Sequence, residues 1–333
     1  MSQPVPVEQQ LKGFADDFEA LRREMGKLVV GQDEVVEGVL IAAVGGGHVV
    51  LEGVPGVGKT VVVEALAGAL QLAFQRIQFT PDLMPADLLG TYVVMETPQG
   101  RRTFEFQKGP LFSNCILADH INRGVPKTQA ALLEAMEGDT ISVANETFQL
   151  PQPFFIMATQ NPMEMEGAYP LPEPQWDRFW FKLVSRLPTP AEIEEILDRT
   201  TEGEAPIVSK MCDGRRLLEM RQIARKVPIA AELRRWAIAL VGATHPGGER
   251  APEIVRRCVS YGASPRGAQA LVLGAKIRAA AGRRREVGLE DLRALALPVL
   301  RHRIILNYHG QAEGVAADAI VSAVLEAVAA HAA

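Results

Sequence analysis

A glycine-rich segment, GVPGVGKT at residues 53–60, constrains the fold more than any other part of the 333-residue sequence. It matches the pattern G-x-x-x-x-G-K-[ST] at every fixed position. Its three glycines let the backbone turn tightly, so that N–H groups converge on phosphate oxygens. Lys59 brings a point charge to the β and γ phosphates, and the Thr60 hydroxyl can ligate magnesium. Such a loop needs a strand before it and a helix after it.

The flanking sequence satisfies this requirement. HVVLEG (48–53) is a β-prone apolar run, and VVVEALAGAL (61–70) has a helical pattern whose positive end would face a bound anion. Similar apolar runs occur at residues 73–79, 114–119, 154–160 and 179–184. Runs of this length suit strands buried on both faces, as in a parallel sheet, and helical patterns separate several of them. This βαβ rhythm predicts an α/β domain with helices on both faces of the sheet.

Further helices and two inserted hairpins are expected around this domain. A first helix is predicted at 8–28, and a second begins at about Asp33, which can cap it. One β-hairpin is predicted at 91–106 around a Pro/Gly turn, and another at 140–150 with a turn at Asn145. These hairpins are either decoration or, in a ring-forming protein, surfaces that face a partner or a central channel.

The sequence changes character after SRLPTPAE (185–192), where two prolines mark a break. We place a domain boundary near Leu187, with a nucleotide-binding core at 1–186 and an all-helical domain at 187–333. Everything beyond the boundary reads as helical. The candidate helices lie near residues 190–200, 214–226, 230–243, 251–260, 266–281, 289–308 and 315–332.

The apolar run NCILAD (114–119) ends in an acid, Asp119. An aspartate at a strand end, downstream of a phosphate-binding loop, can hold magnesium directly or through water. The alternative is an ordinary turn residue. In many nucleotide-hydrolysing proteins a second acid follows and activates water, but here the next residue is His120.

Several longer strings resemble MoxR-type AAA+ ATPases, and the similarity runs over nearly the whole chain. They are VVGQDEVV (29–36), LEGVPGVGKT (51–60), INRGVPKTQAALLEAMEG (121–138), ATQNPMEMEGAYPLPEPQWDRF (158–179), YGASPRGAQAL (261–271) and LPVLRHRIILNYHGQAEG (297–314). Many families share the phosphate-binding loop, whereas the string at 158–179 and GASPR are far more specific. The resemblance implies an α/β AAA+ core with a five-stranded parallel sheet and inserted β-hairpins, followed by a helical lid. It also implies ATP in the cleft between core and lid, and a ring that is usually hexameric.

The resemblance further assigns roles to single residues. Asn161 would be the polar sensor that helps to orient the attacking water, although it could simply form a turn before a proline. Arg178 would reach the γ-phosphate of a neighbouring subunit, and Arg266 would be the lid arginine that touches the phosphates. Either arginine could instead form an ordinary surface salt bridge. The expected ATP contacts are Val30 and Gly31 on the adenine side and Gly53, Pro55, Gly56, Val57, Gly58, Lys59, Thr60 and Val61 in the loop. The expected Mg²⁺ ligands are Thr60 and Asp119.

His120 replaces the glutamate that the family usually carries after the aspartate. A positioned general base contributes about 10²–10⁴-fold, so its loss predicts slow hydrolysis with ATP binding retained. Histidine could still accept a proton or orient water, because an unperturbed pKa of about 6.5 leaves much of it neutral at pH 7. Glu164 or Glu166 could stand in for the missing base. A degenerate or altered site is the remaining alternative.

Composition and charge set limits on function. The chain is 47% hydrophobic with a formal net charge of −5, so the molecule as a whole is not drawn to nucleic acid or anionic membrane. GRRRE (282–286) is either a local basic patch or a solvated loop. Three cysteines lie far apart without metal-ligand spacing, which is typical of a reduced, cytoplasmic protein. No membrane-spanning segment or signal-peptide core is recognisable.

Three functions remain open at this point. The first is an ATP-driven remodelling or chaperone-like machine, which the resemblance would pair with a separate client or von Willebrand factor A domain protein. The second is a nucleotide-gated scaffold with little or no hydrolysis, which His120 favours. The third is a nucleic-acid motor, against which the acidic charge and the lack of an appended DNA-binding module count.

Overall fold

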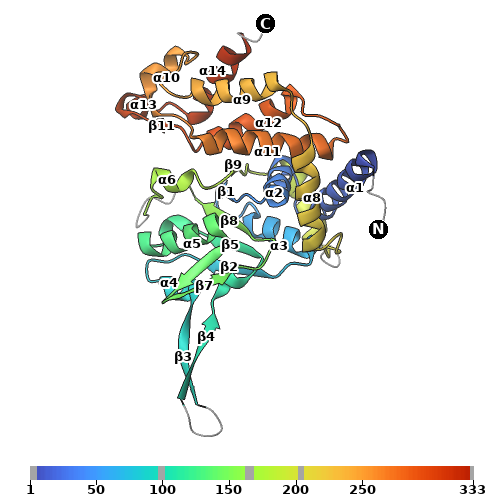
Figure 1. The fold of residues 1–333 in the computed structure, drawn as a ribbon, viewed down its shortest axis with the longest axis vertical. Helices are drawn as coiled ribbons and strands as arrows, with labels where there is room; N and C mark the ends of the chain where they lie inside the picture. The colour runs from blue at the N-terminus through green and yellow to red at the C-terminus, as the bar shows by residue number, and fades with distance from the viewer. Residues whose placement is uncertain (1–5, 97–101, 162–168, 202–205, 331–333) are drawn as a thin grey trace.

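The computed structural model describes residues 6–96, 102–161, 169–201 and 206–330. Its centre is a five-stranded parallel sheet in the order β2-β5-β8-β1-β9 (Figure 1). The strands are β1 (Val49–Glu52), β2 (Phe74–Gln78), β5 (Cys115–Asp119), β8 (Phe155–Gln160) and β9 (Phe181–Val184). The expected α/β fold with a five-stranded parallel sheet is therefore confirmed.

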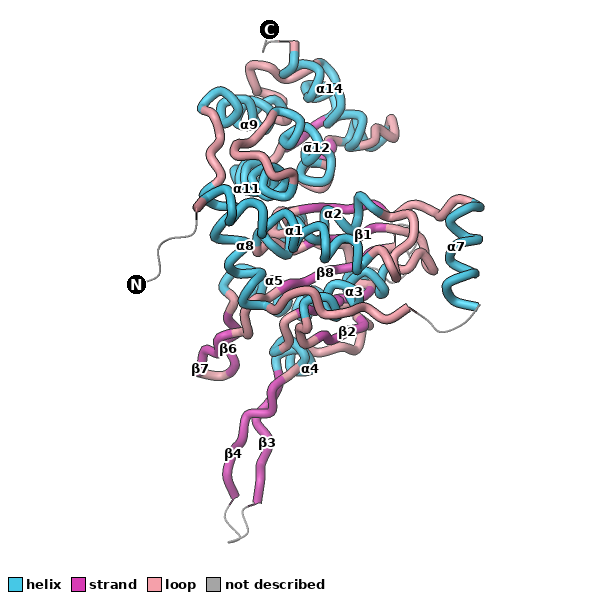
Figure 2. Tube along the Cα trace, turned by 90° about the vertical axis from the view of Figure 1, so that its right-hand side faces the viewer, coloured by secondary structure: helices cyan, strands magenta, loops and turns pink. Residues whose placement is uncertain are grey.

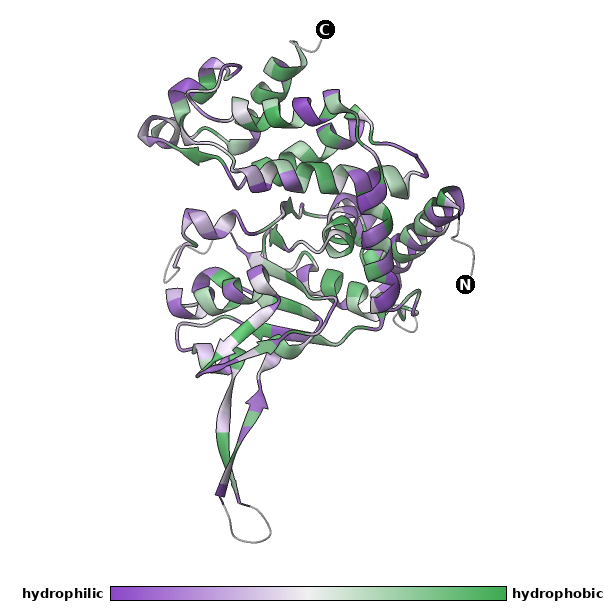
Figure 3. Ribbon diagram, viewed as in Figure 1, coloured by the Kyte–Doolittle hydropathy of each residue, from purple (hydrophilic) through white to green (hydrophobic). Residues whose placement is uncertain are grey.

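Alternation along the strands sends side chains to two hydrophobic cores, because successive strand residues point to opposite faces. Leu51, Leu117 and Met157 enter the core that is shared with α1 (Val7–Met25), α2 (Asp33–Gly45) and α3 (Lys59–Leu70). Their neighbours Val50, Ala118 and Ala158 enter the core on the other face, which packs under α4 (Pro85–Leu89) and α5 (Pro126–Gly138). Figure 3 shows hydrophobic residues gathered on these central strands and on α2. This layering fixes which side chains share a face at each edge of the sheet.

The strand β2 differs from the sequence prediction of a run buried on both faces. It lies at the edge of the sheet, and only Ile77 of its five residues is fully buried. Gln75, Arg76 and Gln78 are exposed at the level of whole residues. The edge position tolerates these polar residues because only one neighbouring strand covers β2.

Both predicted hairpins are present. β3 (Gly90–Glu96) pairs with β4 (Arg102–Lys108), and this ribbon projects far from the body of the molecule (Figures 1 and 2). β6 (Thr140–Val143) pairs with β7 (Glu146–Gln149), with the turn at Ala144 and Asn145 as expected. Phe106 of the long ribbon stacks on Phe148 of the short one, with ring centroids 4.4 Å apart, so the two hairpins support each other at their bases.

The chain after β9 is largely helical. Its helices are α7 (Pro190–Thr201), α8 (Gly214–Lys226), α9 (Ala231–Ala243), α10 (Glu253–Cys258), α11 (Pro265–Ala281), α12 (Leu289–Leu300), α13 (Tyr308–Ala312) and α14 (Ala317–Ala329). Short elements between the core strands are η1 (Pro110–Phe112), η2 (Ile121–Arg123) and α6 (Glu173–Trp176). Two details differ from the prediction. The helix expected at 289–308 ends at Leu300, and a small antiparallel pair, β10 (Val259–Tyr261) with β11 (Ile305–Leu306), interrupts the helical pattern.

The region beyond the proposed boundary at Leu187 does not lie entirely apart from the core. The Met211 N–H donates to the Ala69 carbonyl at 2.8 Å, and Arg216 forms an ion pair with Asp17 of α1 at 2.7 Å. Arg221 Nε donates to the carbonyl of Val44 at 2.9 Å. Thus α8 and the segment before it pack on α1–α3, and α11 also packs on α1 and α2. The other helices from α9 to α14 lie beyond the β9 edge of the sheet (Figure 1). The division at 186/187 stays a proposal.

Smaller predictions for helix ends are mixed. The first helix begins at Val7 and the second begins at Asp33 as expected, but Gln32 occupies the N-cap position that the sequence suggested for Asp33. Among the described residues, no helix is both long enough and apolar enough to cross a bilayer.

Candidate nucleotide site and its counterpart across the sheet

The phosphate-binding loop connects β1 to α3 at the carboxyl edge of the sheet. Gly56 and Gly58 have φ angles of 84° and 78°, which an L side chain rarely adopts. A Cβ atom at either position would meet no other heavy atom within 4 Å, so these glycines serve the backbone conformation and leave the space above the loop open. The N–H groups of the first turn of α3 have no intrahelical acceptor and face this space with the positive end of the helix dipole. The loop is thus built to receive an anion.

Lys59 bridges the loop internally in this structure. Its Nζ donates to the carbonyl oxygens of Gly53 at 2.6 Å and Val54 at 3.0 Å. The loop is also braced from outside, because Gln32 Nε2 donates to the Val57 carbonyl at 2.7 Å. Gln32 is in turn held by the Ser185 hydroxyl at 2.7 Å. The loop conformation is therefore supported by the chain on both sides of it.

Asp119 lies at the end of β5 on the same face of the sheet as α3, because Leu117, two residues earlier, packs in the α3 core. Its carboxylate is almost fully buried and has partners on both oxygens. Oδ1 accepts a hydrogen bond from the Thr159 hydroxyl at 2.5 Å. Oδ2 accepts from Arg76 Nη2 at 2.6 Å and Nε at 3.2 Å. Burial opposes ionisation, but these hydrogen bonds outweigh it and hold the pKa of Asp119 below its usual value.

His120 takes a conformation that is uncommon for a residue with a side chain. Its φ and ψ are 55° and 49°, in the left-handed region that histidine tolerates better than most residues. The backbone N–H of His120 donates to Thr159 Oγ1 at 2.9 Å. The same hydroxyl donates to Asp119, so one threonine of β8 fixes both residues of the Asp-His pair. The imidazole Nε2 lies 3.9 Å from Asp119 Oδ1 and is therefore directed at the carboxylate.

Asn161 directly follows β8, the strand between β5 and β1. The Gly53 N–H donates to the Gln160 carbonyl at 3.3 Å, which places Asn161 between the loop and Asp119. The structure thus brings Lys59, Thr60, Asp119, His120 and Asn161 to one edge. Glu164 and Glu166, proposed as substitutes for the missing base, lie outside the described residues.

The adenine-side segment at Val30 and Gly31 is covered by residues that follow β9. Arg186 Nη2 donates to the Gly31 carbonyl at 2.9 Å and pairs with Glu192 at the start of α7. The hydrogen bond from Arg186 lowers the pKa of Glu192 to about 2. A Cβ at Gly31, whose φ is 69°, would lie 2.2 Å from the Glu192 carboxyl carbon. A side chain at position 31 would therefore displace the Glu192 carboxylate from this segment.

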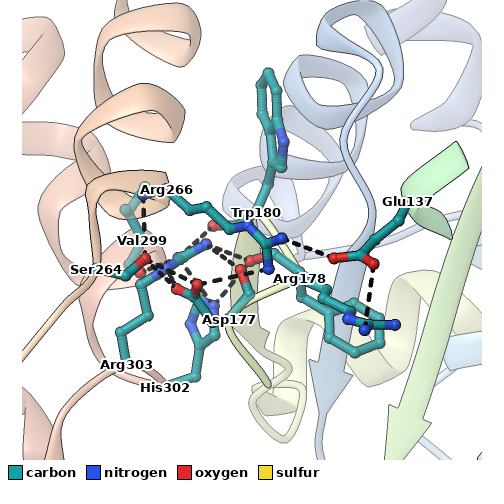
Figure 4. Close-up of polar contacts among 10 residues, drawn as sticks. Glu137, Asp177, Arg178, Trp180, Ser264, Arg266, Val299, His302 and Arg303 are labelled. Atoms are coloured by element: carbon teal, nitrogen blue, oxygen red, sulfur yellow. Dashed lines mark hydrogen bonds and ion pairs between the residues drawn. The ribbon is translucent and has the colours of Figure 1, made fainter. Parts of the chain in front are cut away.

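Arg178 and Arg266 lie elsewhere, at the amino edge of the same sheet. Arg178 precedes β9, and the neighbouring Trp180 N–H donates to the carbonyl of His48, which precedes β1. Glu137 ends α5 at this edge and accepts from Arg266 Nη2 at 2.7 Å and pairs with Arg178 Nη2 at 3.2 Å. Figure 4 shows both guanidinium groups meeting at this one carboxylate. The structure brings the two arginines together, but not to the phosphate-binding loop of their own chain.

The two arginines line a polar cavity of about 210 Å³. The charged side chains that line it are Arg178, Arg266, Arg303, Glu137 and Asp177. Three arginines against two carboxylates give a formal excess of one positive charge. Arg303 is the buried member, and burial lowers its pKa to about 10. It remains charged at neutral pH and donates to Asp177 Oδ1 at 2.9 Å and to the Phe179 carbonyl at 2.6 Å. This excess of positive charge suits an anionic group from outside the chain.

Asp177 connects the lid to the core beside this cavity. The Ser264 hydroxyl, which caps α11, donates to the Asp177 carboxylate at 2.8 Å (Figure 4). Arg303 reaches the same carboxylate from the segment that follows α12. The relative position of the arginines therefore depends on hydrogen bonds between segments far apart in the sequence.

One buried histidine, His48, and one partly buried histidine, His302, brace the amino edge. His48 Nδ1 accepts from the Ile156 N–H at 3.0 Å, while its Nε2 lies 3.3 Å from the Met136 carbonyl. His302 Nε2 lies 3.0 Å from the Phe179 carbonyl. Burial lowers the pKa of His48 to about 4 and also lowers that of His302. Both rings are neutral at pH 7.

Sequence reasoning missed several residues of both edges. Arg76, Thr159 and Gln32 at the carboxyl edge were not singled out, and neither was Glu137 at the amino edge. One signal was available for Arg76, since an arginine inside a predicted parallel strand needs a partner. No comparable signal marked Thr159 or Glu137, whose importance depends on contacts across the fold.

Comparison with known proteins agrees with this geometry. Residues 48–181 match the model of the ATPase family associated with various cellular activities (AAA), and residues 251–324 match the AAA lid domain. Chaperone MoxR1 of Mycobacterium tuberculosis is 39% identical over 96% of this chain and 84% of its own length. Protein MoxR of Methylorubrum extorquens is 31% identical over 91% of each chain. A crystal structure from Cytophaga hutchinsonii, described as an inferred ATPase, superposes with a TM-score of 0.88 at 40% identity and 96% coverage of both chains.

The matched regions include the phosphate-binding loop, the strands β1, β2, β5 and β8, and the helices α10 to α13 of the helical region. The two full-length relatives exceed the identity at which a shared family is secure, and the structural likeness extends over the same residues. The chain belongs to the MoxR-type AAA+ ATPases.

Proposed function

We propose that this chain binds Mg–ATP at the carboxyl edge of its sheet and hydrolyses it with the help of Arg178 and Arg266 from a neighbouring copy. The neighbour completes the site within a ring, which we take to be a hexamer. One observation carries this proposal, namely that the arginines and the phosphate-binding loop lie at opposite edges of the same sheet. The core strands contain four to six residues, so the edges are separated by roughly 13–20 Å at about 3.3 Å per residue.

A γ-phosphate held at the loop therefore cannot reach the arginines of its own chain. A ring with head-to-tail contacts would solve the problem, because it places the amino edge of one copy against the carboxyl edge of the next. The excess positive charge of the arginine cavity then meets a γ-phosphate. We therefore assign Arg266 to the same action across the interface as Arg178, in place of the contact within its own core–lid cleft that the sequence suggested.

The carboxyl edge has the residues that Mg–ATP requires. Lys59 and the first-turn N–H groups of α3 would hold the phosphates, and Thr60 with Asp119 would hold magnesium. Within the described residues no cluster of three or more His, Cys, Asp or Glu side chains could hold a metal ion. This agrees with a magnesium ion that phosphate oxygens and water largely coordinate. When bound, the ion would supply charge stabilisation for phosphoryl transfer.

Hydrolysis is proposed to be slow because His120 occupies the usual position of the base. The imidazole is partly buried and directed at Asp119, so as a neutral ring it can accept a proton or hold water through one nitrogen. A carboxylate would offer two acceptor oxygens and a negative charge. The second candidate, a nucleotide-gated scaffold with little turnover, rests on this same replacement.

The output of the cycle is proposed to be remodelling or maturation of partner proteins in the cytoplasm. The Mycobacterium tuberculosis relative is named a chaperone, which supports protein clients for this chain. A separate protein with a von Willebrand factor A domain is the partner we favour. Nucleic acid is not favoured, given the net charge of −5.

Mixing two inactive variants tests the proposal. Lys59→Ala removes the phosphate contact, and Arg178→Ala removes the contribution to the neighbour, so each ring alone should release no phosphate above background. In randomly mixed rings about a quarter of the interfaces pair an intact loop with an intact arginine, so up to about a quarter of the wild-type rate should return. Arg235→Ala, at an exposed ion pair on α9, is the control that should remain active.

Two results would overturn the proposal. Full activity of Arg178→Ala would show that the amino edge takes no part in hydrolysis. Failure of the mixture to recover any activity, when native mass spectrometry shows mixed rings, would exclude sharing of the site between neighbours. Wild-type turnover equal to that of Lys59→Ala, with ATP still bound, would favour the scaffold function.

A further inference from the structure

Arg76 is a charged residue of the carboxyl edge that neither the motif nor the family comparison singles out. It lies on β2, two residues before Gln78, which pairs with Asp119 in the parallel register. Its side chain therefore shares the face of Asp119 and extends toward the end of the strand. Two of its N–H groups donate to the same carboxylate oxygen, Asp119 Oδ2, at 2.6 and 3.2 Å.

This pair leaves Asp119 electrically balanced without a metal ion. Thr159 donates to Oδ1, and the guanidinium neutralises Oδ2, while the carboxylate itself is 7% exposed. A buried carboxylate without a partner would be costly, so Arg76 stabilises the site between rounds of nucleotide binding. The arginine side chain is 48% exposed and can turn outward into water when it is displaced.

A magnesium ion and Arg76 cannot both occupy the Oδ2 side of Asp119. Two cations that share one carboxylate oxygen repel each other strongly at a separation of a few ångströms in a partly desolvated site. His120 replaces the family's glutamate in the adjacent position, so a second carboxylate that could satisfy one of the cations is absent there. Magnesium that ligates Asp119 directly must therefore compete with the arginine.

We propose that Arg76 is the resident counter-cation of Asp119, which holds the carboxylate in place and must be displaced when Mg²⁺ enters with the nucleotide. This inference rests on the proposed function, since it concerns the same nucleotide site. Its consequence is that Mg²⁺ binds more weakly than the loop and aspartate alone would allow. Nucleotide binding should accordingly depend less on Mg²⁺ than in an otherwise identical chain without the arginine.

The test measures metal dependence without requiring hydrolysis. Affinity for a fluorescent ADP analogue is measured in EDTA and across a series of free Mg²⁺ concentrations, and Mn²⁺ bound to the protein–ADP complex is counted by electron paramagnetic resonance. Arg76→Met should leave the affinity in EDTA unchanged and lower the half-saturating Mg²⁺ concentration by roughly three- to tenfold. Mn²⁺ occupancy at a fixed subsaturating concentration should rise in parallel.

Two further variants make the comparison specific. Arg22→Met removes a bidentate arginine of similar exposure that pairs with Glu19 on α1, and it should leave both readings unchanged. Arg76→Lys keeps the charge but loses the fork-shaped contact, so its Mg²⁺ dependence should lie between those of the wild type and Arg76→Met. It also preserves a partner for Asp119 if the methionine variant folds poorly.

Three outcomes would contradict the inference. A higher Mg²⁺ requirement in Arg76→Met would mean that the arginine helps to build the metal site. A loss of affinity in EDTA would make Arg76 a phosphate ligand, and an unchanged Mg²⁺ dependence in both Arg76 variants would make the pair purely structural. If the wild type bound no nucleotide at any Mg²⁺ concentration, the proposed function itself would fail.

Discussion

The two edges of the central sheet are built in different ways. At the carboxyl edge, the phosphate-binding loop supplies most functional groups from one short stretch of chain, and Asp119 is added by the end of one strand. At the amino edge, Glu137, Asp177, Arg178, Arg266 and Arg303 come from four separate segments. The first edge is organised mainly by local backbone conformation, and the second by contacts between the core and the lid.

Charge distinguishes the edges as well. Asp119 is balanced by Arg76 and Thr159 within its own chain, whereas two arginines at the amino edge share the single carboxylate of Glu137. A local site can be complete in one chain, while the amino edge has a positive excess suited to an anion. The difference is the basis for the proposal that one protomer binds the nucleotide and a pair of protomers hydrolyses it.

The largest expected effect separates these two roles. Lys59→Ala should abolish measurable ATP binding, whereas Arg178→Ala should leave ATP affinity within a few-fold of the wild type. Hydrolysis by Arg178→Ala should fall by about 10³–10⁵-fold, or to background, because an arginine at the γ-phosphate stabilises charge only in the transition state. Calorimetry and steady-state phosphate release measure the two quantities. Equal loss of binding in both variants would mean that the edges serve the same nucleotide within one chain.

His120→Glu is the next largest test and concerns the carboxyl edge alone. Restoring the carboxylate should raise kcat by about 10²-fold, the lower end for a positioned base, because phosphoryl transfer depends mainly on positioning and charge. ATP affinity should change little. His120→Gln, which can hydrogen-bond but cannot accept a proton at neutral pH, is the matched control and should not be faster than the wild type. If the wild type hydrolysed ATP rapidly and His120→Glu did not raise kcat, the imidazole would already act as the base.

The same contrast explains what the sequence could predict. The loop, the five strands, both hairpins and the positions of Lys59, Thr60 and Asp119 follow from local patterns, because motif, strand and helix occupy one continuous segment. The α/β domain with helices on both faces and the helical region after it were also predicted from the residue pattern, the family resemblance identified that region as an AAA+ lid, and this fold is confirmed. The site roles of these residues stay proposals.

Other features could not be read from local sequence. The β10–β11 pair forms between residues more than forty positions apart, so its two short strands give no local signal. The ion pairs of Glu137 with Arg178 and Arg266 join α5 to the segment before β9 and to α11. Only the packing of the lid brings these segments together. Arg266 was expected to touch the phosphates, and its position at the amino edge could not be predicted because a motif specifies a residue type but not the edge at which a lid will place it.

As the pH falls, we expect the structure at the amino edge to be destabilised before nucleotide binding at the carboxyl edge is lost. The folded pKa of His48 is about 4 against about 6.5 when unfolded, so between these values the unfolded chain binds a proton that the folded chain does not. Stability from this group is complete above about pH 6.5 and is lost as the pH falls toward 4, by at most about 3 kcal/mol. His302 has a shift in the same direction and adds to the loss.

Urea unfolding at pH 7 and pH 5 measures this effect. His48→Gln should show a smaller loss of unfolding free energy between the two pH values than the wild type, while the exposed His309→Gln should match the wild type. Phosphate release should decline in the same window more than ADP binding does, since His48 contacts Met136 beside Glu137. An equal decline of both would show that acid does not act selectively on the amino edge.

The smallest expected effect concerns Glu137, which must release the arginines when a neighbour's phosphate arrives. Glu137→Gln keeps the size of the side chain and one acceptor oxygen but removes the charge that competes with phosphate. Because the carboxylate is 43% exposed, the change should lower the half-saturating ATP concentration by only about two- to fivefold, and added salt should reduce the difference. Glu134→Gln, exposed one turn earlier on α5, is the matched control. If Glu137→Gln instead lost as much activity as Arg178→Ala, the carboxylate would be holding the arginines in their working position, and the amino edge would be preorganised before the neighbour binds.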